Sequence, residues 1–108
     1  MPIAPVRVSM PAEARQGEIV EIKSIVRHVM ETGYRVDSVG KRIPRHIIKR
    51  MTVTYDGEEV FAMDFTQGVA ANPFIAFTTL AVGTGELVFT WEDDQGEIIT
   101  ARKTLTVV

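Results

Sequence analysis

Hydrophobic and polar residues alternate along most of this chain, in short runs that are separated by turn residues. The clearest run covers residues 18–27, and its apolar-side positions are Val20, Ile22, Ser24 and Val26. Residues 51–55 repeat the pattern with Met51, Val53 and Tyr55 on one face and two threonines on the other. Alternation with a period of two, carried by β-branched and aromatic residues, is typical of strands with one buried face.

Extending this pattern over the whole chain predicts about seven strands, at residues 4–9, 18–27, 51–55, 58–65, 74–82, 86–94 and 97–108. Asp56-Gly57 lies between two of them, and a D-G pair favours a type I′ hairpin because both central positions need positive φ. Trp91 lies in the middle of an alternating run and is expected to be the central core aromatic. No segment has a helical period.

These features predict an all-β fold, an immunoglobulin-like antiparallel β-sandwich of about seven strands, in a single domain over residues 1–108. A small closed barrel is the alternative architecture. A chain of 108 residues is long enough for one hydrophobic core and too short for two. Its apolar content of 45% and charged content of 24% are ordinary for a globular domain.

The segment from residue 28 to residue 50 interrupts the alternation. It contains both histidines of the chain, His28 and His46, and a dense basic run within residues 41–50. Gly33 and Gly40 are expected to supply positive φ values. Since a proline biases the preceding residue toward extended backbone, Ile43-Pro44 argues against a helix. A long irregular segment in a small regular domain is where function is expected first.

Composition excludes several kinds of chemistry. The formal net charge of −2 argues against nucleic acid as a partner, because duplex binding needs a strongly positive face. The chain has no cysteine, which excludes disulfides, thiolate nucleophiles and zinc–thiolate sites. No apolar run approaches the roughly 20 residues of a membrane-spanning helix, so no membrane association is expected. No signal peptide is recognised at the N-terminus, so export would depend on a partner.

The residues of the irregular segment suggest three chemical interpretations. His28, Met30 and His46 resemble a sparse copper ligand set, since imidazole and thioether both bind copper. Glu31, Asp37 and His46 include general acids and bases, but no catalytic motif accompanies them, and catalysis is not expected. The basic run is interpreted as a solvated or partner-facing face, with Ile43, Ile47 and Ile48 docked inward.

Four apolar residues in or next to loops are predicted to be exposed: Val29, Met30, Tyr34 and Phe74. If they lie on one side, they form a protein-binding patch, because an exposed apolar patch on a small domain marks an interaction site.

Many residues of the chain resemble one known family. The matching positions are His28 with Met30-Glu31-Thr32-Gly33, Arg35, Gly40, Ile43-Pro44-Arg45, Ile47-Ile48, Tyr55-Asp56-Gly57, Ala71-Asn72-Pro73-Phe74, Phe77, Gly85, Phe89, Trp91, Asp93, Asp94 and Gly96. This pattern, from about Val6 to Val107, is similar to the SoxZ family of bacterial thiosulfate oxidation. The M-E-T-G block with P-R downstream is its specific part, and Val29 departs from the proline that the family often has there.

The resemblance implies a non-catalytic subunit of a sulfur-carrier heterodimer, with an immunoglobulin-like fold. Its partner would be SoxY, whose cysteine carries the sulfur intermediates, and this chain would help to present them to SoxXA, SoxB and SoxCD. The resemblance also implies a periplasmic location, reached by export together with the signal-bearing SoxY.

On this interpretation the chain has no catalytic residues, no cofactor and no metal site. The residues predicted to contact the partner are His28, Met30, Tyr34, Arg35, Pro44, Arg45 and Phe74. The alternative function is a small periplasmic copper-binding sandwich that uses His28, Met30 and His46.

Overall fold

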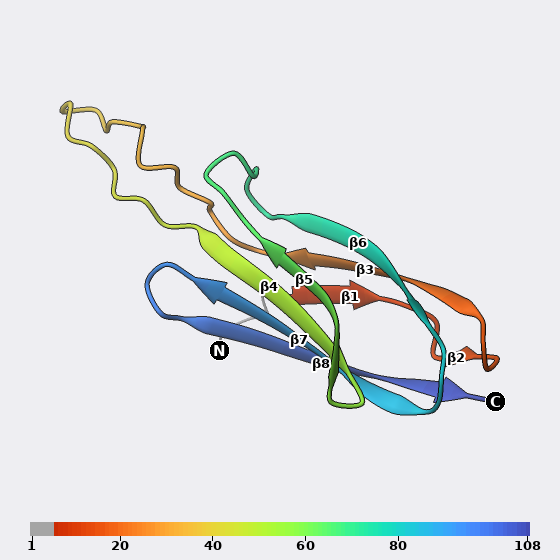
Figure 1. The fold of residues 1–108 in the computed structure, drawn as a ribbon. Helices are drawn as coiled ribbons and strands as arrows, with labels where there is room; N and C mark the ends of the chain where they lie inside the picture. Colours follow the sequence, from red (N-terminus) through yellow and green to blue (C-terminus); the bar gives the residue numbers. More distant parts are fainter. Residues whose placement is uncertain (1–5) are drawn as a thin grey trace, which may run out of the picture.

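This computed structural model describes residues 6–108, which contain eight strands in two sheets (Figure 1). They are β1 (Val6–Ser9), β2 (Glu13–Ala14), β3 (Ile19–Val26), β4 (Ile48–Tyr55), β5 (Glu58–Asp64), β6 (Phe74–Leu80), β7 (Gly85–Asp93) and β8 (Ile98–Val107). One sheet has the order β1-β3-β6 and the other the order β2-β8-β7-β4-β5. The described residues include no helix that is long and apolar enough to span a membrane.

The alternating pattern places one face of each sheet in a common core. In β3 the four residues Val20, Ile22, Ser24 and Val26 are buried, and the residues between them are exposed. The largest fully buried side chain is Trp91 in β7, and Phe89 stacks beside it with ring centroids 6.1 Å apart. The predicted inward faces of residues 18–27, 51–55 and 86–94 are therefore confirmed.

The sandwich architecture is also confirmed, and the closed barrel is wrong, because the two sheets are separate. Seven strands pair antiparallel, in the arrangement of an immunoglobulin-like domain. Asp56 and Gly57 both have positive φ, at 50° and 87°, as the hairpin between β4 and β5 requires. This turn sets the register in which Tyr55 pairs with Glu58.

Two strands differ clearly from the sequence prediction. The two-residue strand β2 was not predicted, and it pairs parallel to β8 through Glu13 and Ala14. Strand β4 begins at Ile48 rather than residue 51, because the exposed Lys49 and Arg50 hide its alternation. The structure describes the first strand from Val6 to Ser9, and residues 4 and 5 of its predicted range lie outside the described residues.

Residues 27–47, which connect β3 to β4 and are called the arm from here on, extend beyond the ends of both sheets (Figure 1). The Cα radius of gyration is 16.3 Å, and the principal extents are 59 × 30 × 19 Å. A compact domain of this length has a radius of about 13 Å. The arm therefore makes the protein elongated and places most of its own residues away from the core.

Candidate functional site

The arm is an irregular hairpin rather than an open loop. Its two sides are joined at the base by a bridge between Glu31 and His46, whose amides each donate to the other's carbonyl at 2.7 and 2.8 Å. A second bridge joins Val36 to Arg42. Gly33 has a φ of 86°, and a Cβ there would lie 3.1 Å from the Cβ of Arg45, so only glycine lets the two sides approach this closely.

The tip of the arm is a closed turn with an apolar residue at its end. Asp37 Oδ1 accepts hydrogen bonds from the amides of Val39 at 3.0 Å and Lys41 at 2.9 Å. Gly40 completes the turn with a φ of 81°. These bonds define the backbone of the turn, while the Val39 side chain is 84% exposed. The tip therefore presents an apolar side chain on an ordered turn.

Apolar exposure continues along the arm. Tyr34 is 70% exposed, and Val29 and Val36 are also exposed. Burying a valine or larger apolar side chain is worth about 1.5–3 kcal/mol, so these residues gain stabilisation only from another molecule. The arm thus has the properties of a binding surface that is not completed within the described chain.

Two acidic residues at the end of β7 hold the returning side of the arm. Asp93 Oδ2 lies 3.0 Å from His46 Nε2, and Asp93 Oδ1 accepts from the amides of Gln95 and Glu97. Asp94 accepts from Arg45 Nε at 2.9 Å and from the Ile47 amide at 3.2 Å. The turn after β7 therefore anchors the base of the arm by polar contacts.

The histidines pack together at this base. Their ring centroids are 4.5 Å apart and the ring planes meet at 70°. His28 Nδ1 accepts the Met30 amide at 3.0 Å, which places the proton of a neutral ring on Nε2. Burial, followed by the neighbouring His46, lowers the pKa of His28, against the opposing effect of nearby carboxylates. The ring is therefore favoured in its neutral form.

Asp93 is buried, yet its pKa is lowered, whereas burial in an apolar site raises the pKa of a carboxyl group. Burial alone would raise the pKa of Asp93, but the hydrogen bonds from His46 and from the Glu97 and Gln95 amides outweigh it and lower the pKa. Asp93 therefore stays ionised while only 3% exposed.

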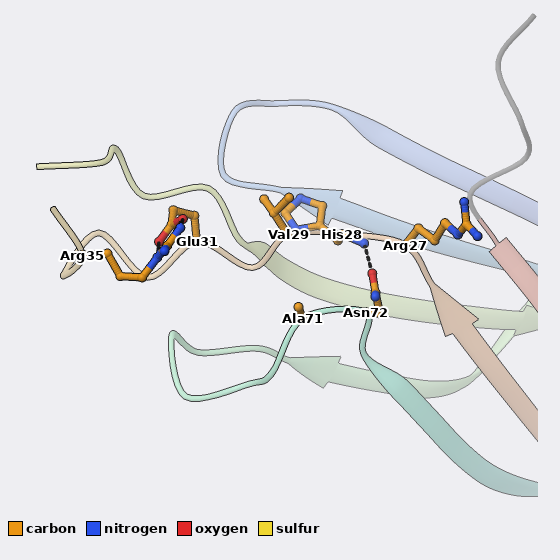
Figure 2. Close-up of a pocket in the computed structure, with 7 residues that line it drawn as sticks. All are labelled: Arg27, His28, Val29, Glu31, Arg35, Ala71 and Asn72. Atoms are coloured by element: carbon orange, nitrogen blue, oxygen red, sulfur yellow. Dashed lines mark hydrogen bonds and ion pairs between the residues drawn. The ribbon is translucent and has the colours of Figure 1, made fainter. Parts of the chain in front are cut away.

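An open pocket lies on the outgoing side of the arm base (Figure 2). Figure 2 shows Arg27 at one end and the Glu31–Arg35 pair at the other, with His28 and Asn72 between them. Asn72 Oδ1 accepts the His28 amide at 3.0 Å, and the His28 carbonyl accepts the Asn72 amide at 2.9 Å. These two bonds join the arm to the segment before β6. Arg35 is held by Glu31, which has its pKa lowered by that hydrogen-bonded pair.

The structure corrects the predicted exposure of one residue. Met30 was expected to be exposed, but it is only 4% exposed, and its sulfur accepts the Ile48 amide at 3.3 Å. Its φ of 48° turns the side chain into the body at the arm base. The burial of Ile47 and Ile48 is confirmed, and Ile43 is half-buried. Met30 therefore belongs to the core.

The other predicted contact residues are distributed over two surfaces. Tyr34, Arg35 and Pro44 are exposed on the arm, and Arg45 is exposed but paired with Asp94. His28 is half-buried at the arm base. Phe74 is 59% exposed at the start of β6, where it pairs with Ile25 across the small sheet. Three basic residues near the arm base form ion pairs with acidic residues: Arg45–Asp94, Lys49–Glu92 and Arg50–Asp64.

The copper ligand set predicted from the sequence is not favoured by this geometry. His28 and His46 lie together, but the Met30 sulfur is occupied by the Ile48 amide. The third potential ligand beside the histidines is Asp93 instead.

Comparison with protein families gives a match over residues 6–104, to the family described as "Sulphur oxidation protein SoxZ". This range covers nearly the whole chain. The chain belongs to the SoxZ family. The resemblance seen in the sequence is thereby confirmed, together with its assignment to sulfur oxidation. No curated protein matches the chain.

Solved structures with the same fold are only distantly similar to this SoxZ-family chain in sequence. A superoxide reductase (neelaredoxin) from Ignicoccus hospitalis has a TM-score of 0.71 at 15% identity, over 95% of this chain and 80% of that one. A putative superoxide reductase from Thermotoga maritima has a TM-score of 0.67 at 16% identity, over 95% and 85%. The sulfur carrier protein SoxY from Chlorobium limicola f thiosulfatophilum has a TM-score of 0.66 at 14% identity, over 98% and 81%. These likenesses establish a shared sandwich fold.

The sequence did not reveal the anchoring residues Asn72, Asp93 and Asp94. Aspartate is common in turns, so nothing marks Asp93 and Asp94 locally, and their partners in the arm lie about half the chain away in sequence. A usable signal was present in the resemblance, since Asn72 and both aspartates are among its matching positions. Their structural role explains why a hairpin turn and a distant arm occur together in that pattern.

Proposed function

We propose that this chain is the non-catalytic subunit of a sulfur-carrier heterodimer and binds SoxY through its arm. The observation that carries the proposal is the exposed apolar series on an anchored hairpin, Tyr34, Val36 and Val39, in a member of the SoxZ family. Interface centres are rich in tyrosine and other large apolar side chains, and ordering of the arm before binding reduces the entropic cost of association.

The carrier chemistry belongs to the partner in this proposal. This chain has no cysteine and cannot hold a thiol-bound sulfur intermediate. Its part is to stabilise SoxY and to help present the loaded SoxY cysteine to SoxXA, SoxB and SoxCD. The pocket beside His28, with Arg27 at its edge, lies at the arm base where a bound partner would pass.

Co-expression with a SoxY chain tests the proposal. We expect the two chains to co-elute in size exclusion, and Tyr34→Asp to weaken the complex by placing a charge in an apolar contact. Thr100→Asp in β8 is the matched control, since Thr100 is exposed on the sandwich body. Elution of wild-type chain and SoxY as separate species would refute the proposal. Equal weakening by both substitutions would place the interface elsewhere.

The proposal also locates the complex in the periplasm, reached by export with the signal-bearing SoxY. Cell fractionation with and without a functional SoxY signal tests this part. Recovery of the chain in the periplasm without SoxY would contradict joint export.

A further inference from the structure

Three residues from separate parts of the chain bring metal-binding atoms together at the base of the arm. His28 begins the arm, His46 nearly ends it, and Asp93 ends β7. One ligand atom of each lies within 4.8 Å of the others. We call these three residues the histidine cluster. Imidazole nitrogen with a carboxylate oxygen is a donor combination that suits Zn²⁺.

One atom of the cluster lacks a partner in the structure. His28 Nε2 is buried and has no hydrogen bond, although its other nitrogen accepts the Met30 amide. A buried polar atom without a partner is unfavourable, and each instance in a native structure needs an explanation. The surroundings are also acidic, because Asp93, Asp94 and Glu97 all act electrostatically on His28. A cation beside Nε2 would meet both the unpaired nitrogen and this negative charge.

We propose that the histidine cluster binds one Zn²⁺ ion through His28, His46 and Asp93. Three protein ligands with a water at the fourth position is a common zinc arrangement. The pocket in Figure 2 is lined by His28, so one of the three residues of the cluster borders an open pocket. This site differs from the copper set considered from the sequence, since the third ligand is a carboxylate rather than the Met30 sulfur.

The distances require a modest rearrangement. Zn–N and Zn–O bonds of about 2.0–2.2 Å place neighbouring ligand atoms roughly 3.3 Å apart in a tetrahedral site. His46 Nε2 and Asp93 Oδ2 are already 3.0 Å apart. The main movement therefore belongs to His28, the ligand at the outgoing side of the arm.

The backbone at Met30 offers a route for this movement. Zinc on His28 Nε2 leaves the ring proton on Nδ1, which then faces the Met30 amide donor. Met30 has a φ of 48°, in the left-handed region that residues other than glycine rarely adopt. A half turn of the Val29–Met30 peptide would bring the Val29 carbonyl toward Nδ1 and return Met30 to negative φ. Zinc binding is thereby coupled to the orientation of the Val29–Met30 peptide.

Titration of the purified, metal-free chain with ZnCl₂ tests the site by calorimetry and by metal analysis after desalting. We expect one Zn²⁺ per chain, and no comparable binding of Mg²⁺, which prefers oxygen ligands. His28→Gln and His46→Gln should each weaken zinc binding by at least about 10–100-fold, the loss that disturbed metal ligation causes. Asp64→Asn is the matched control, because Asp64 is a carboxylate of the exposed Arg50–Asp64 pair and lies outside the cluster.

NMR on the wild-type chain keeps the test independent of how the variants fold. Zinc should shift the ring ¹⁵N signals of both histidines and the amide of Met30. If no saturable binding occurs up to about 1 mM Zn²⁺, the three residues bind no zinc and only hold the base of the arm together. Zinc affinity equal to that of wild type in both histidine variants would also overturn the site. Neither result affects the SoxY proposal, because SoxY binding is measured separately, in the presence of a chelator.

Discussion

The sandwich body and the arm use the same kinds of apolar residue in opposite ways. In the body, Trp91 and Phe89 are essentially inaccessible to solvent between the two sheets. In the arm, Tyr34, Val36 and Val39 are mostly exposed. Buried apolar area stabilises the fold, whereas exposed apolar area on an ordered hairpin becomes stabilising when a partner covers it. The difference separates the residues that make the chain fold from those that we propose to bind SoxY.

Polar contacts connect these two regions. Asp93 and Asp94 hold the returning side of the arm, and Asn72 holds the outgoing side. Hydrogen bonds depend on orientation more strongly than apolar packing does, so this joint fixes the direction of the arm. It also makes the joint depend on protonation, which apolar packing does not.

The largest effect on stability is expected from the body. Trp91→Ala should lower the free energy of unfolding by about 3–5 kcal/mol, because it leaves a large cavity between the sheets. Val39→Ala at the arm tip should change it by less than about 0.5 kcal/mol, as exposed substitutions do. Urea unfolding measures both. Similar losses in the two variants would show that the arm tip is packed against the body.

The next largest loss of stability is expected from the polar contacts that join the arm to the body. Asp93→Ala removes the acceptor for His46 and for two backbone amides, and each buried donor left unpaired costs about 1–3 kcal/mol. The control is Asp64→Ala, which breaks the exposed Arg50–Asp64 pair and should cost at most about 1 kcal/mol. Urea unfolding would contradict the anchoring role of Asp93 if the two losses were equal.

Protonation of Asp93 is also expected to lower the stability of the chain at acid pH. Its pKa is lowered in the folded state, so its contribution is complete above the usual carboxyl value of 3.8 and is lost as the pH falls through the lower folded value. We expect wild-type stability to decrease below about pH 4 more steeply than that of Asp93→Asn. Urea unfolding of both chains between about pH 2.5 and about pH 5, the range in which carboxyl groups titrate, measures the difference in stability. Parallel curves would contradict it.

A smaller pH effect should come from His28. Because its folded pKa lies below the usual 6.5, the unfolded chain binds more protons as the pH falls past 6.5, and stability declines toward acid. The slope should be well below the about 1.4 kcal/mol per pH unit of a fully buried group, since solvent screens this half-buried ring. Urea unfolding in chelator should show the slope in wild type and not in His28→Gln. The same slope in both would assign it to another group.

Much of the body could be predicted from the sequence, because its structure is set by local alternation. The faces of residues 18–27, the Asp56-Gly57 turn and the position of Trp91 all follow from patterns a few residues long. The strand β2 was missed because two residues carry no period, and their pairing with β8 is not local.

The arm was less predictable, since its contacts join distant residues. The positive φ values of Gly33 and Gly40 are predicted correctly, but the hairpin pairing of the arm is not predicted, because no alternation marks its two sides. The burial of Met30 depends on a left-handed backbone that sequence patterns do not show for methionine. The anchoring by Asp93 and Asp94 similarly required the fold, which brings the turn after β7 against the arm.

The affinity for SoxY of a chain with a polar arm tests the central claim most directly. A variant with Tyr34, Val36 and Val39 all replaced by serine removes the exposed apolar series and leaves every described anchor in place. Calorimetry with SoxY should show at least about a tenfold loss of affinity, which is about 1.4 kcal/mol, with an unfolding free energy close to that of wild type. Unchanged affinity for SoxY in a folded variant would contradict the role of the arm in binding.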